Sequence, residues 1–421
     1  MKNHNSLFTF FSTAAEIDKI WLSTDLFTYS HPPTAITAIF IISIIRKGEP
    51  MKVRFNKSIL SHALDTVQRA AQTKITSNTN NGILIRAAEG RISFEANDYT
   101  IGIKTSCEAE ILEPGDVVVA APQMPGMIKL LPGEEVILET DDAASLCHFR
   151  AGSAHYRFPT MSYDDFPQVE EMERVNVCHM ACADLQKLNS LIAYAAAMEK
   201  NNPVFNGILF EIKGSVFSMS ATNTHRLAIR EITLPEEATS TGRFIVPSGI
   251  LNDVCRLLPD EEGAQVEISW AKSHAAFTFG DTYFITNLIS GEYPDVHRVV
   301  PTRSDVDAKF NLKELSNAIR MVSPISRDIN YNTVNFQFSE EGAIISAEDA
   351  DVGASSVSIP AEVSGRLPLN IVFNCSYIED ILKHSNGETI TFHLLANGPM
   401  LIEQEEDKSY IYVVTPMRGR Q

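Results

Sequence analysis

The chain has 421 residues, of which 44% are hydrophobic, enough for about three domains with cores of their own. Its formal net charge of −18 excludes a generally basic DNA-binding surface, so any contact with nucleic acid has to come from a local basic patch. The six cysteines are scattered and no convincing export signal is present, which favours reduced thiols and a cytoplasmic protein.

Residues 1–50 stand apart from the rest of the chain. The apolar run Thr34–Ile45 is shorter than the roughly 20 residues that cross a bilayer. Lys47-Gly48-Glu49 requires codons that can contain a purine-rich ribosome-binding site, just upstream of Met51. We therefore expect translation to start at Met51 and residues 1–50 to be spurious, with a disordered tail as the alternative. The N-terminal mass of the native protein tests this expectation.

The first unit is predicted to run from 51 to 175. It opens with an alternating strand pattern at Lys52–Phe55. Asn56 or Ser58 can cap the helix that follows, because a side-chain oxygen at that position accepts a bond from an otherwise unpaired amide. The further predicted elements are strands at Arg91–Ala96, Ile101–Ile111 and Asp116–Ala121, a helix at Gln123–Leu131, and strands at Glu135–Glu139, Leu146–Arg150 and His155–Phe158.

Units two and three, predicted over 176–303 and 304–421, repeat this order. Each begins with a helical pattern, followed by a strand, a second helix and a final aromatic strand. In unit two these are Met180–Ala197, Val216–Ala221, a helix ending at Cys255–Pro259, and Tyr283–Thr286. In unit three they are Phe310–Ser326, Ala343–Ala347, a helix ending at Ile381–Lys383, and Tyr410–Val413.

A short sequence recurs at one place in each unit. Asn81-Gly82-Ile83-Leu84 returns as Asn206-Gly207-Ile208-Leu209, and Asn332-Thr333-Val334-Asn335 is a diverged third copy. A repeat at fixed spacing predicts tandem copies of one structural unit. Each unit is expected to hold two helices and seven or eight short strands, an α+β fold with helices gathered on one side of antiparallel sheet. The short linkers favour a fixed arrangement of the units.

Equivalent helices in tandem copies are expected to face the same side. The acidic runs, such as Asp260-Glu261-Glu262, fall in turns. A basic side on an acidic body suits contact with a polyanion through phosphates, independent of base sequence. The alternative is that these are ordinary solvated helix faces. The predicted DNA-facing residues are Lys74, Lys129, Lys187, Lys200, Arg256, Lys313, Arg320 and Lys383.

No catalytic or cofactor motif is found. The chain has no Gly-x-Ser-x-Gly, no phosphate-binding glycine loop before a lysine, and no metal-ligand cluster. Cys178-His179-Met180-Ala181-Cys182 lacks a second ligand pair, so a metal site there is not expected. His225 has Ser220 and Asp295 in the same unit, but nothing in the sequence places them as a triad. We expect no cofactor and no enzymatic activity.

From Met51 to about Arg418 the chain resembles the bacterial sliding clamp family, the beta subunit of DNA polymerase III. The stretches that carry the resemblance are Ala221–Ala228, Gly291–Val299, Phe373–Tyr377 and Tyr412–Arg418, together with the threefold repeat. The resemblance implies three like domains per subunit and a head-to-tail ring of two subunits. Such a ring encircles duplex DNA and tethers the replicative polymerase as a processivity factor.

The resemblance also implies a pocket between the second and third domains for short Leu/Phe-rich peptides. Its partners would be the polymerase catalytic subunit, the clamp loader, other polymerases and repair factors, and no membrane. Apolar and thioether side chains offer an adaptable groove for such anchors, with Arg226, Arg298, His225 and Asn374 at the rim. The implied wall is Phe205, Thr222, His225, Arg226, Leu227, Pro294, Arg298, Val299, Tyr331, Asn374, Tyr377, Pro399, Met400, Val413, Val414, Thr415, Pro416, Met417 and Arg418.

The ring's seam, by the same resemblance, joins an edge strand of the first domain to the third domain of a second subunit. Tyr156 and Phe158 would lie on one side, and Ile325, in the loop after the third unit's first helix, on the other. Pairing of strand edges satisfies open backbone groups, and aromatic burial adds hydrophobic stabilisation. The alternative places both aromatics in the core of their own domain.

The chain departs from the family pattern at several positions. Thr224 stands where the family usually has glycine, which puts a left-handed backbone there in doubt. Thr415 replaces a common methionine, and Gln123 and Ser248 stand near positions that are often basic. Besides a clamp, an enzyme and a specialised relative, such as a peptide-binding scaffold without DNA, remain competing functions. Retention on circular but not on linear DNA separates them.

Overall fold

The structure is a computed structural model that describes residues 50–71, 81–88, 90–141, 145–197, 202–327, 332–349 and 351–417. The expectation for residues 1–50, Pro50 excepted, lies outside these ranges, as do four predicted site residues: Lys74, Lys200, Tyr331 and Arg418. Among the described residues, no helix has the length and apolar character needed to span a membrane.

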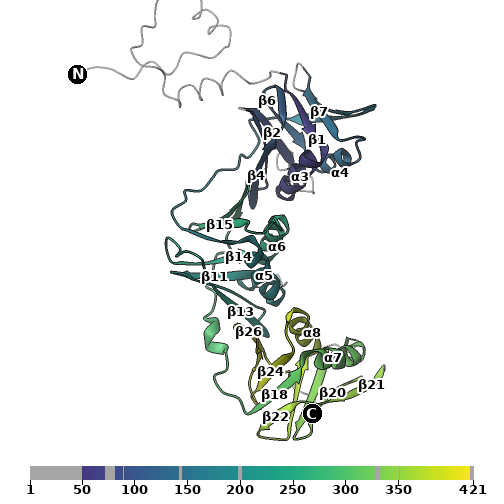
Figure 1. Cartoon of the computed structure of the whole chain (residues 1–421), viewed down its shortest axis with the longest axis vertical. Helices are drawn as coiled ribbons and strands as arrows, with labels where there is room; N and C mark the ends of the chain where they lie inside the picture. Colours follow the sequence, from purple (N-terminus) through teal and green to yellow (C-terminus); the bar gives the residue numbers. More distant parts are fainter. Residues whose placement is uncertain are drawn as a thin grey trace, which may run out of the picture. The chain divides into compact units, whose positions relative to one another are not determined.

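Three sets of elements follow one another along the chain (Figure 1). The first set, domain 1 hereafter, holds helices α3 and α4 on strands β1 to β9. Its elements are β1 (Lys52–Asn56), α3 (Lys57–Val67), the 3₁₀ helix η2 (Gln68–Ala70), β2 (Gly82–Ala88), β3 (Arg91–Asn97), β4 (Ile101–Glu108), β5 (Glu110–Glu113), β6 (Gly115–Ala120), α4 (Met124–Lys129), β7 (Glu135–Thr140), β8 (Leu146–Ala151) and β9 (Ala154–Met161).

Domain 2 repeats this order with helices α5 and α6. Its elements are β10 (Val177–Ala181), α5 (Cys182–Ile192), η3 (Ala193–Ala195), η4 (Pro203–Asn206), β11 (Gly207–Lys213), β12 (Val216–Thr222), β13 (Arg226–Thr233), β14 (Gly242–Pro247), α6 (Ser248–Leu257), β15 (Gln265–Trp270), β16 (His274–Phe279), β17 (Thr282–Asn287) and η5 (Val296–Val299).

Domain 3 completes the described chain with helices α7 and α8. Its elements are β18 (Val306–Asn311), α7 (Leu312–Arg327), β19 (Thr333–Ser339), β20 (Gly342–Asp349), β21 (Gly353–Ile359), β22 (Glu362–Gly365), β23 (Leu369–Asn374), α8 (Cys375–His384), β24 (Thr389–Leu394), β25 (Met400–Gln404) and β26 (Asp407–Val414). The threefold α+β repeat predicted from the sequence is confirmed.

Several predicted elements differ in detail. The single strand expected over Ile101–Ile111 is two strands, because β4 pairs with β3 and β17 whereas β5 pairs with β1 at the far edge of the same sheet. The described residues form nine, eight and nine strands in the three domains, so domains 1 and 3 each have one more strand than expected. Ile325 is not in a loop: α7 continues to Arg327 and includes it.

The first helix shows how the sequence sets local structure. Asn56 caps α3, its Oδ1 accepting from the Ser58 amide at 2.9 Å. Leu60 and Leu64 are fully buried on the inner face, as expected from their helical spacing. Ile59, next to Leu60 in the sequence, is 41% exposed, so the buried stripe of the helix is narrow.

Two strand pairings join the three domains. β4 of domain 1 pairs antiparallel with β17 of domain 2, from Thr282 opposite Thr105 to Thr286 opposite Ile101. β13 of domain 2 pairs in the same way with β26 of domain 3, from Arg226 opposite Val414 to Arg230 opposite Tyr410. The described strands therefore form one sheet of 13 strands across domains 1 and 2, one of 9 across domains 2 and 3, and one of 4 in domain 3.

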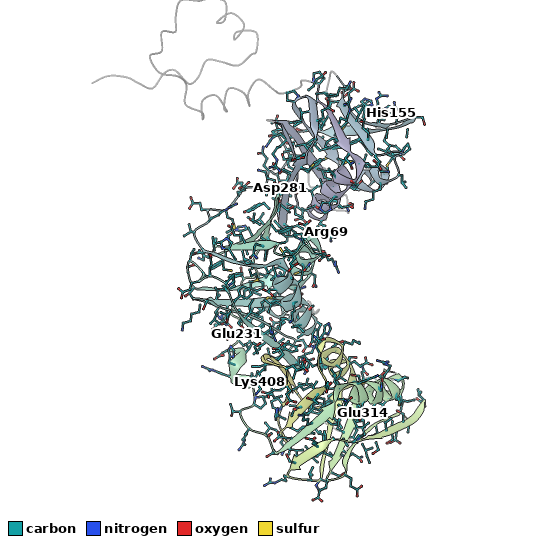
Figure 2. The ribbon with its side chains drawn as sticks, viewed as in Figure 1. Arg69, His155, Glu231, Asp281, Glu314 and Lys408 are labelled. Atoms are coloured by element: carbon teal, nitrogen blue, oxygen red, sulfur yellow. The ribbon has the colours of Figure 1, made fainter. Side chains whose placement is uncertain are left out.

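Helices meet near these junctions as well. At the first junction, the Arg69 guanidinium lies 2.9 Å from the Asp253 carboxylate of α6, and Arg91 pairs with Asp281 at 2.7 Å. Figure 2 shows Arg69 and Asp281 at this place between domains 1 and 2. Within each domain the two helices pack against each other. The first helix of each domain also packs on a strand: α3 on β4, α5 on β13 and α7 on β21. Of these strands, β4 and β13 are the ones that pair with the next domain.

Candidate functional site

The turn between β12 and β13 holds the residues of the Ala221–Ala228 stretch. Asn223 Oδ1 accepts from the amides of His225 and Arg226 at 3.1 and 3.0 Å. The Thr222 hydroxyl donates to the Arg226 carbonyl at 2.6 Å and accepts from the Thr224 amide at 3.1 Å. These bonds fix a tight turn whose side chains are presented next to domain 3.

Thr224 adopts a left-handed backbone with φ of 75°, although it replaces the expected glycine. A β-branched residue is rarely found there, because its Cβ crowds the backbone at a cost of roughly 1–3 kcal/mol. The turn geometry is thus retained in spite of the substitution.

Replacing Thr224 with glycine is expected to stabilise the protein by about 0.5–1 kcal/mol, since relief of this crowding outweighs the added chain entropy of glycine. Gly214→Ala is the matched control, because Gly214 has φ of 58° with open space around a new Cβ and should lose about 1 kcal/mol. Calorimetric unfolding of both variants measures the change in the free energy of unfolding. A Thr224→Gly variant that is less stable than the unsubstituted protein would show that Thr224 is not strained.

An apolar cluster lies under this turn. Leu227 and Val413 are opposite one another across the β13–β26 pairing. Phe205 contacts the Tyr293 ring edge to face, at 5.8 Å between centroids. The Tyr293 hydroxyl accepts from the Thr222 amide at 3.1 Å, and burial raises the pKa of Tyr293. The buried members of the cluster are Leu209, Leu227, Ile229, Ile245, Tyr293, Val296, Leu401 and Val413.

The C-terminal segment closes the other side of the site. The Thr415 amide and hydroxyl both donate to the His225 carbonyl, at 2.9 and 3.0 Å. The Met417 amide donates to the Val372 carbonyl at 2.8 Å, which holds Thr415, Pro416 and Met417 beside β23 in a half-exposed position. Residues nearly 200 positions apart in the sequence therefore meet at one place, as the resemblance implied.

The remaining wall residues differ in their access to solvent. Pro294, Arg298 and Val299 are exposed on the segment around η5, and Pro399 is half-buried. Met400 and Val414 are fully buried in the main core, so neither side chain reaches solvent at the wall in this structure. They support the wall from behind.

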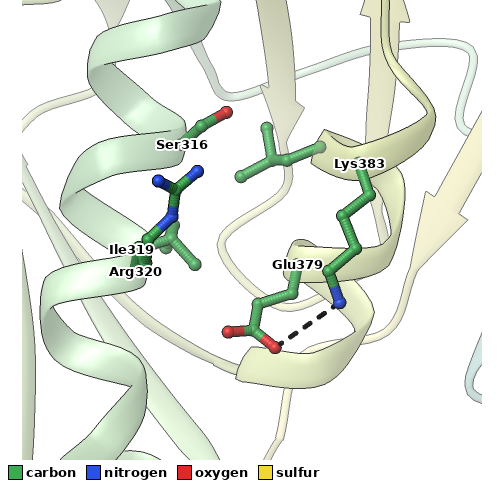
Figure 3. Close-up of a pocket in the computed structure, with 6 residues that line it drawn as sticks. Ser316, Ile319, Arg320, Glu379 and Lys383 are labelled. Carbon is green, nitrogen blue, oxygen red and sulfur yellow. Dashed lines mark ion pairs between the residues drawn. The ribbon is translucent and has the colours of Figure 1, made fainter.

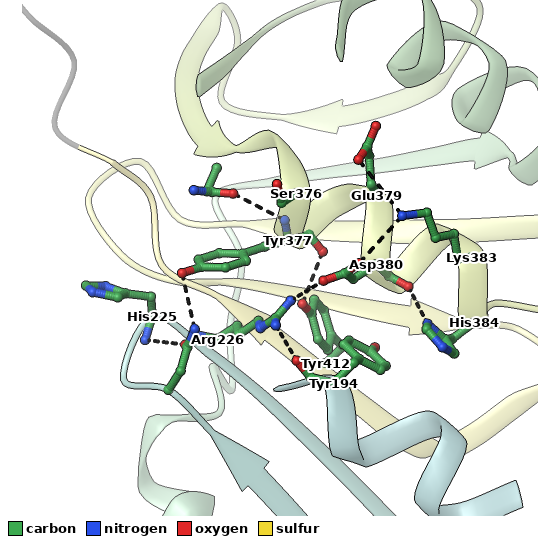
Figure 4. Close-up of polar contacts among 12 residues, drawn as sticks. Tyr194, His225, Arg226, Ser376, Tyr377, Glu379, Asp380, Lys383, His384 and Tyr412 are labelled. Carbon is green, nitrogen blue, oxygen red and sulfur yellow. Dashed lines mark hydrogen bonds and ion pairs between the residues drawn. The ribbon is translucent and has the colours of Figure 1, made fainter. Parts of the chain in front are cut away.

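Arg226 is the largest correction to the expected site. Its guanidinium does not stand at the rim, because its side chain is only 10% exposed and is held between domains 2 and 3 (Figure 4). Nη1 lies 2.6 Å from the Asp380 carboxylate of α8, and Nη2 donates to the Tyr194 carbonyl. The same guanidinium covers the Tyr377 ring at 4.6 Å. Arg226 therefore joins two domains in this structure.

Other polar groups extend this junction. The Tyr194 ring stacks on His384 at 4.3 Å, and the Tyr410 hydroxyl donates to the Leu191 carbonyl at 2.9 Å. Burial raises the pKa of both tyrosines, so their hydroxyls stay neutral. The Tyr377 hydroxyl, a predicted wall group, accepts from Asn223 at 3.1 Å, and Asn374 caps α8 by accepting from the Tyr377 amide.

Sequence reasoning missed Tyr194 and Asp380 in this network. Both lie on helical segments where their spacing resembles that of any partly solvated face, so no local signal marked them. Their role depends on the strand pairing of β13 with β26, which the sequence did not reveal.

The predicted DNA-facing side chains carry more acidic partners than expected. Lys129 pairs with Asp65 at 2.6 Å, Arg256 with Asp253 at 3.2 Å, and Lys383 lies 3.7 Å from Asp380. Lys187, Lys313 and Arg320 are exposed and have no ion pair with another residue in the described ranges. The helix faces are therefore mixed in charge, and α5 and α7 carry exposed basic groups beside exposed Asp184 and Glu314.

A small cavity of about 120 Å³ lies between α7 and α8 (Figure 3). Arg320 and Lys383 line it from opposite helices, with Glu379 4.0 Å from the Lys383 ammonium. Two cations on facing helices can approach one phosphate, which fits the predicted DNA-facing role of both residues.

The described residues form neither a metal-binding site nor a catalytic triad. No group of three or more His, Cys, Asp or Glu side chains is placed to hold a metal ion there. All six cysteines are free thiols, and burial raises the pKa of Cys178 to about 12, which disfavours its thiolate. His225 is exposed in the turn, whereas Ser220 is buried in β12 and Asp295 caps η5.

The comparisons with known proteins cover the same part of the chain. A crystal structure of the DNA polymerase sliding clamp from Bacillus subtilis superposes with a TM-score of 0.84 at 25% identity, covering 88% of this chain and 100% of that one. A Pseudomonas aeruginosa sliding clamp bound to griselimycin has the same fold, with a TM-score of 0.82 at 24% identity over 88% of this chain and 100% of that one.

Sequence relatives agree with this likeness. The beta sliding clamp of Bacillus subtilis strain 168 is 25% identical over 378 residues, which is 87% of this chain and 100% of the relative. Sequence models of the N-terminal, central and C-terminal domains of the DNA polymerase III beta subunit match residues 51–170, 180–295 and 297–418. With all three domains matched in order over a fold of three like units, the chain belongs to the DNA polymerase III beta subunit family.

Proposed function

We propose that this protein is a non-catalytic DNA sliding clamp, which encircles duplex DNA and tethers a replicative polymerase in the cytoplasm. The domains we assign to it are 51–175, 176–303 and 304–421. Membership of the DNA polymerase III beta subunit family supports the role, and the repeated strand pairing between domains carries it.

The strand pairing follows one rule. In each junction within the chain, the strand on which the first helix packs pairs with the last strand of the next domain: β4 with β17, and β13 with β26. Continuing the series leaves β21 of domain 3, which lies at a sheet edge, and β9, the last strand of domain 1, which pairs with β6 only at Thr160 and Met161. A second subunit that pairs its β9 with β21 makes a third and equivalent junction.

Such a contact is head to tail, and contacts of this kind close into a ring when the rotation between copies allows it. The predicted seam residues fit, because Tyr156 and Phe158 lie half-buried on β9 and Ile325 is half-buried on α7, which packs on β21. We propose a ring of two subunits, as the family resemblance implies.

DNA held by enclosure needs few tight contacts. Lys187, Lys313 and Arg320 offer exposed charges, and Lys129, Arg256 and Lys383 offer charges shared with acids. Phosphates reached by these groups would be bound independently of base sequence and weakly at physiological salt. Weak contact suits a protein that has to slide.

The site between domains 2 and 3 is proposed to bind short Leu/Phe-rich peptides of the polymerase, the clamp loader and other partners. Its half-exposed groups are Phe205, Tyr377 and the Thr415–Met417 segment, with His225, Pro294, Arg298 and Val299 at the open side. They surround a buried apolar cluster, which is the arrangement expected for peptide anchors with a polar rim.

The double substitution Met417→Ala with Arg298→Ala is expected to lower the affinity for a Leu/Phe-rich polymerase tail peptide by roughly 10- to 100-fold, because an apolar contact and a rim charge are lost. Fluorescence anisotropy with a labelled peptide measures this. Met172→Ala with Arg174→Ala, on the loop before β10, is the matched control and should leave affinity unchanged. If the double variant and the control bind the peptide with equal affinity, the peptide does not bind at this site between domains 2 and 3.

A peptide-binding scaffold without DNA is the second candidate. The mixed charge of the helix faces favours such a scaffold, because three of the six described residues that were predicted to face DNA form ion pairs with carboxylates. A scaffold binds the tail peptide normally but leaves circular and linear DNA at the same rate.

A further inference from the structure

Domain 1 contains a larger cavity away from the site between domains 2 and 3. Its volume is about 410 Å³, within the range of pockets that hold ligands in proteins. Val118 and Phe166 form its apolar side together with Met161, over the buried Leu84. Asn81, Ser162 and Asp165 supply its polar groups.

The internal repeat places this cavity where domain 2 has its apolar cluster. Gly82 pairs with Ala120 in domain 1, and Gly207 pairs with Pro247 in domain 2. A Cβ built on Gly82 would lie 2.8 Å from Val118, and one on Gly207 would lie 2.3 Å from Ile245. Both glycines are thus needed for the same close packing of strand against side chain.

The next residues correspond as well. Met161 is opposite Val118 in the β6–β9 pairing, and the Ile289 amide donates to the Ile245 carbonyl at 2.9 Å in domain 2. Phe166-Pro167 then takes the place of Tyr293-Pro294. The sequence showed the repeat of strands but not this second pocket, because only the fold brings Met161 and Phe166 onto Val118.

The two places differ in charge. In domain 2, Arg243 on β14 pairs with Glu211 on β11 at 3.0 Å. At the equivalent pair in domain 1 the signs are exchanged: Asp116 on β6 pairs with Arg86 on β2 at 3.4 Å. Asp116 lies on the same strand face as Val118 and Ala120, and the only charged residue among those lining the cavity is Asp165, which is exposed. Because Asp116 is neutralised by Arg86, the domain 1 cavity carries one exposed carboxylate, that of Asp165, at its rim.

We propose that this cavity binds an apolar side chain of an extended partner peptide in which the neighbouring residue is lysine or arginine. The apolar side chain contacts Val118, Met161 and Phe166, and the cation approaches Asp165. The inference rests partly on the proposed function, since it extends peptide binding from domain 2 to its repeat in domain 1.

A backbone group of the peptide also has a partner in the cavity. Asn81 Oδ1 is buried without a hydrogen bond to the described residues, and so is the equivalent Asn206 Oδ1. In domain 3 the corresponding Asn332 is satisfied, accepting from Ser326 at 2.6 Å and donating to Ser376. A buried acceptor of this kind is stabilised by an incoming amide, and since Asn81 lines the cavity, a rotation of its side chain would bring Oδ1 to the peptide.

The test uses methyl NMR of the full chain labelled at its 12 methionines. Met161 lines the domain 1 cavity, whereas Met417 lies at the site between domains 2 and 3. The probe is acetyl-Ser-Leu-Lys-Ser-amide, with acetyl-Ser-Leu-Glu-Ser-amide and acetyl-Ser-Ser-Lys-Ser-amide as controls. Met161→Leu identifies the Met161 signal with little change in side-chain volume.

The Leu-Lys probe is expected to move the Met161 signal at concentrations on the order of 1–10 mM, as suits so short a peptide. The Leu-Glu probe should bind about threefold more weakly and the Ser-Lys probe roughly tenfold or more weakly. Asp165→Lys should weaken binding of the Leu-Lys probe. Glu113→Lys, which replaces an exposed carboxylate on β5, should leave that binding unchanged. Both substitutions are on the surface, so neither threatens folding.

A Met161 signal that stays in place, or that moves equally with all three probes, would overturn the proposal. So would a response confined to Met417, which assigns the probe to the other site. If Met161 responds while Leu/Phe-rich peptides fail to bind between domains 2 and 3, the domain 1 site stands and the proposed tether fails.

Discussion

Arg226→Ala is expected to destabilise the contact between domains 2 and 3 by about 2–4 kcal/mol. The substitution removes an ion pair at 2.6 Å and a bond to the Tyr194 carbonyl from a side chain that is 10% exposed. It also leaves the Asp380 carboxylate with the more distant Lys383 ammonium, at 3.7 Å, as its one cationic partner among the described residues. The cost comes mainly from polar groups left unpaired in a partly buried place.

Hydrogen exchange with mass spectrometry shows where this cost falls, because a protein of three domains need not unfold in one step. Amides of β13 and β26 should exchange faster, and those of β4 and β17 should not. Arg298→Ala is the control, since Arg298 is 83% exposed and its pair with Asp295 should contribute less than about 0.5 kcal/mol. Unchanged exchange at β13 and β26 would show that Arg226 does not hold the domains together.

Tyr156→Ala with Phe158→Ala is expected to weaken the dimer by roughly 100- to 1,000-fold, because each ring has two seams and each seam loses two aromatic contacts. Sedimentation measures the mass, which should fall from about twice the chain mass of 46.6 kDa toward the chain mass itself. Leu130→Ala, at a 76% exposed apolar residue of domain 1 outside β9, is the control and should stay dimeric.

Phe158 also contacts Phe149 edge to face at 5.7 Å, so the double variant loses packing in its own domain. Ile325→Asp provides an independent test from the opposite edge, where α7 packs on β21. A double variant and an Ile325→Asp variant that both remain dimeric would place the seam elsewhere.

The repeat made the fold predictable, because each unit carries the same order of helical and alternating patterns. The structure confirms equivalent pairings at the three copies, with Gly82 opposite Ala120, Gly207 opposite Pro247 and Thr333 opposite Asn374. At Ala109, where β4 ends and β5 begins, the mixed polar and apolar sequence of Ile101–Ile111 gave no sign of the break.

The site was less predictable, since its parts come from two domains. The resemblance brought the β12–β13 turn and the C-terminal segment together, and the hydrogen bonds from Thr415 to His225 agree with it. It could not show that the Arg226 guanidinium points away from the rim, because that depends on Tyr194 and Asp380. Nor could charge counting reveal that Asp65 lies next to Lys129 of the neighbouring helix, or Asp253 next to Arg69 of domain 1.

Retention on DNA of different topology tests the central claim most directly. The protein is assembled on nicked circular duplex, excess salt is added to remove phosphate contacts, and half of the sample is cut once to make it linear. A clamp remains on the circles and leaves the linear molecules by sliding off their ends. Equal loss from circles and from linear duplex would show that the protein grips DNA or does not hold it at all, and would contradict enclosure.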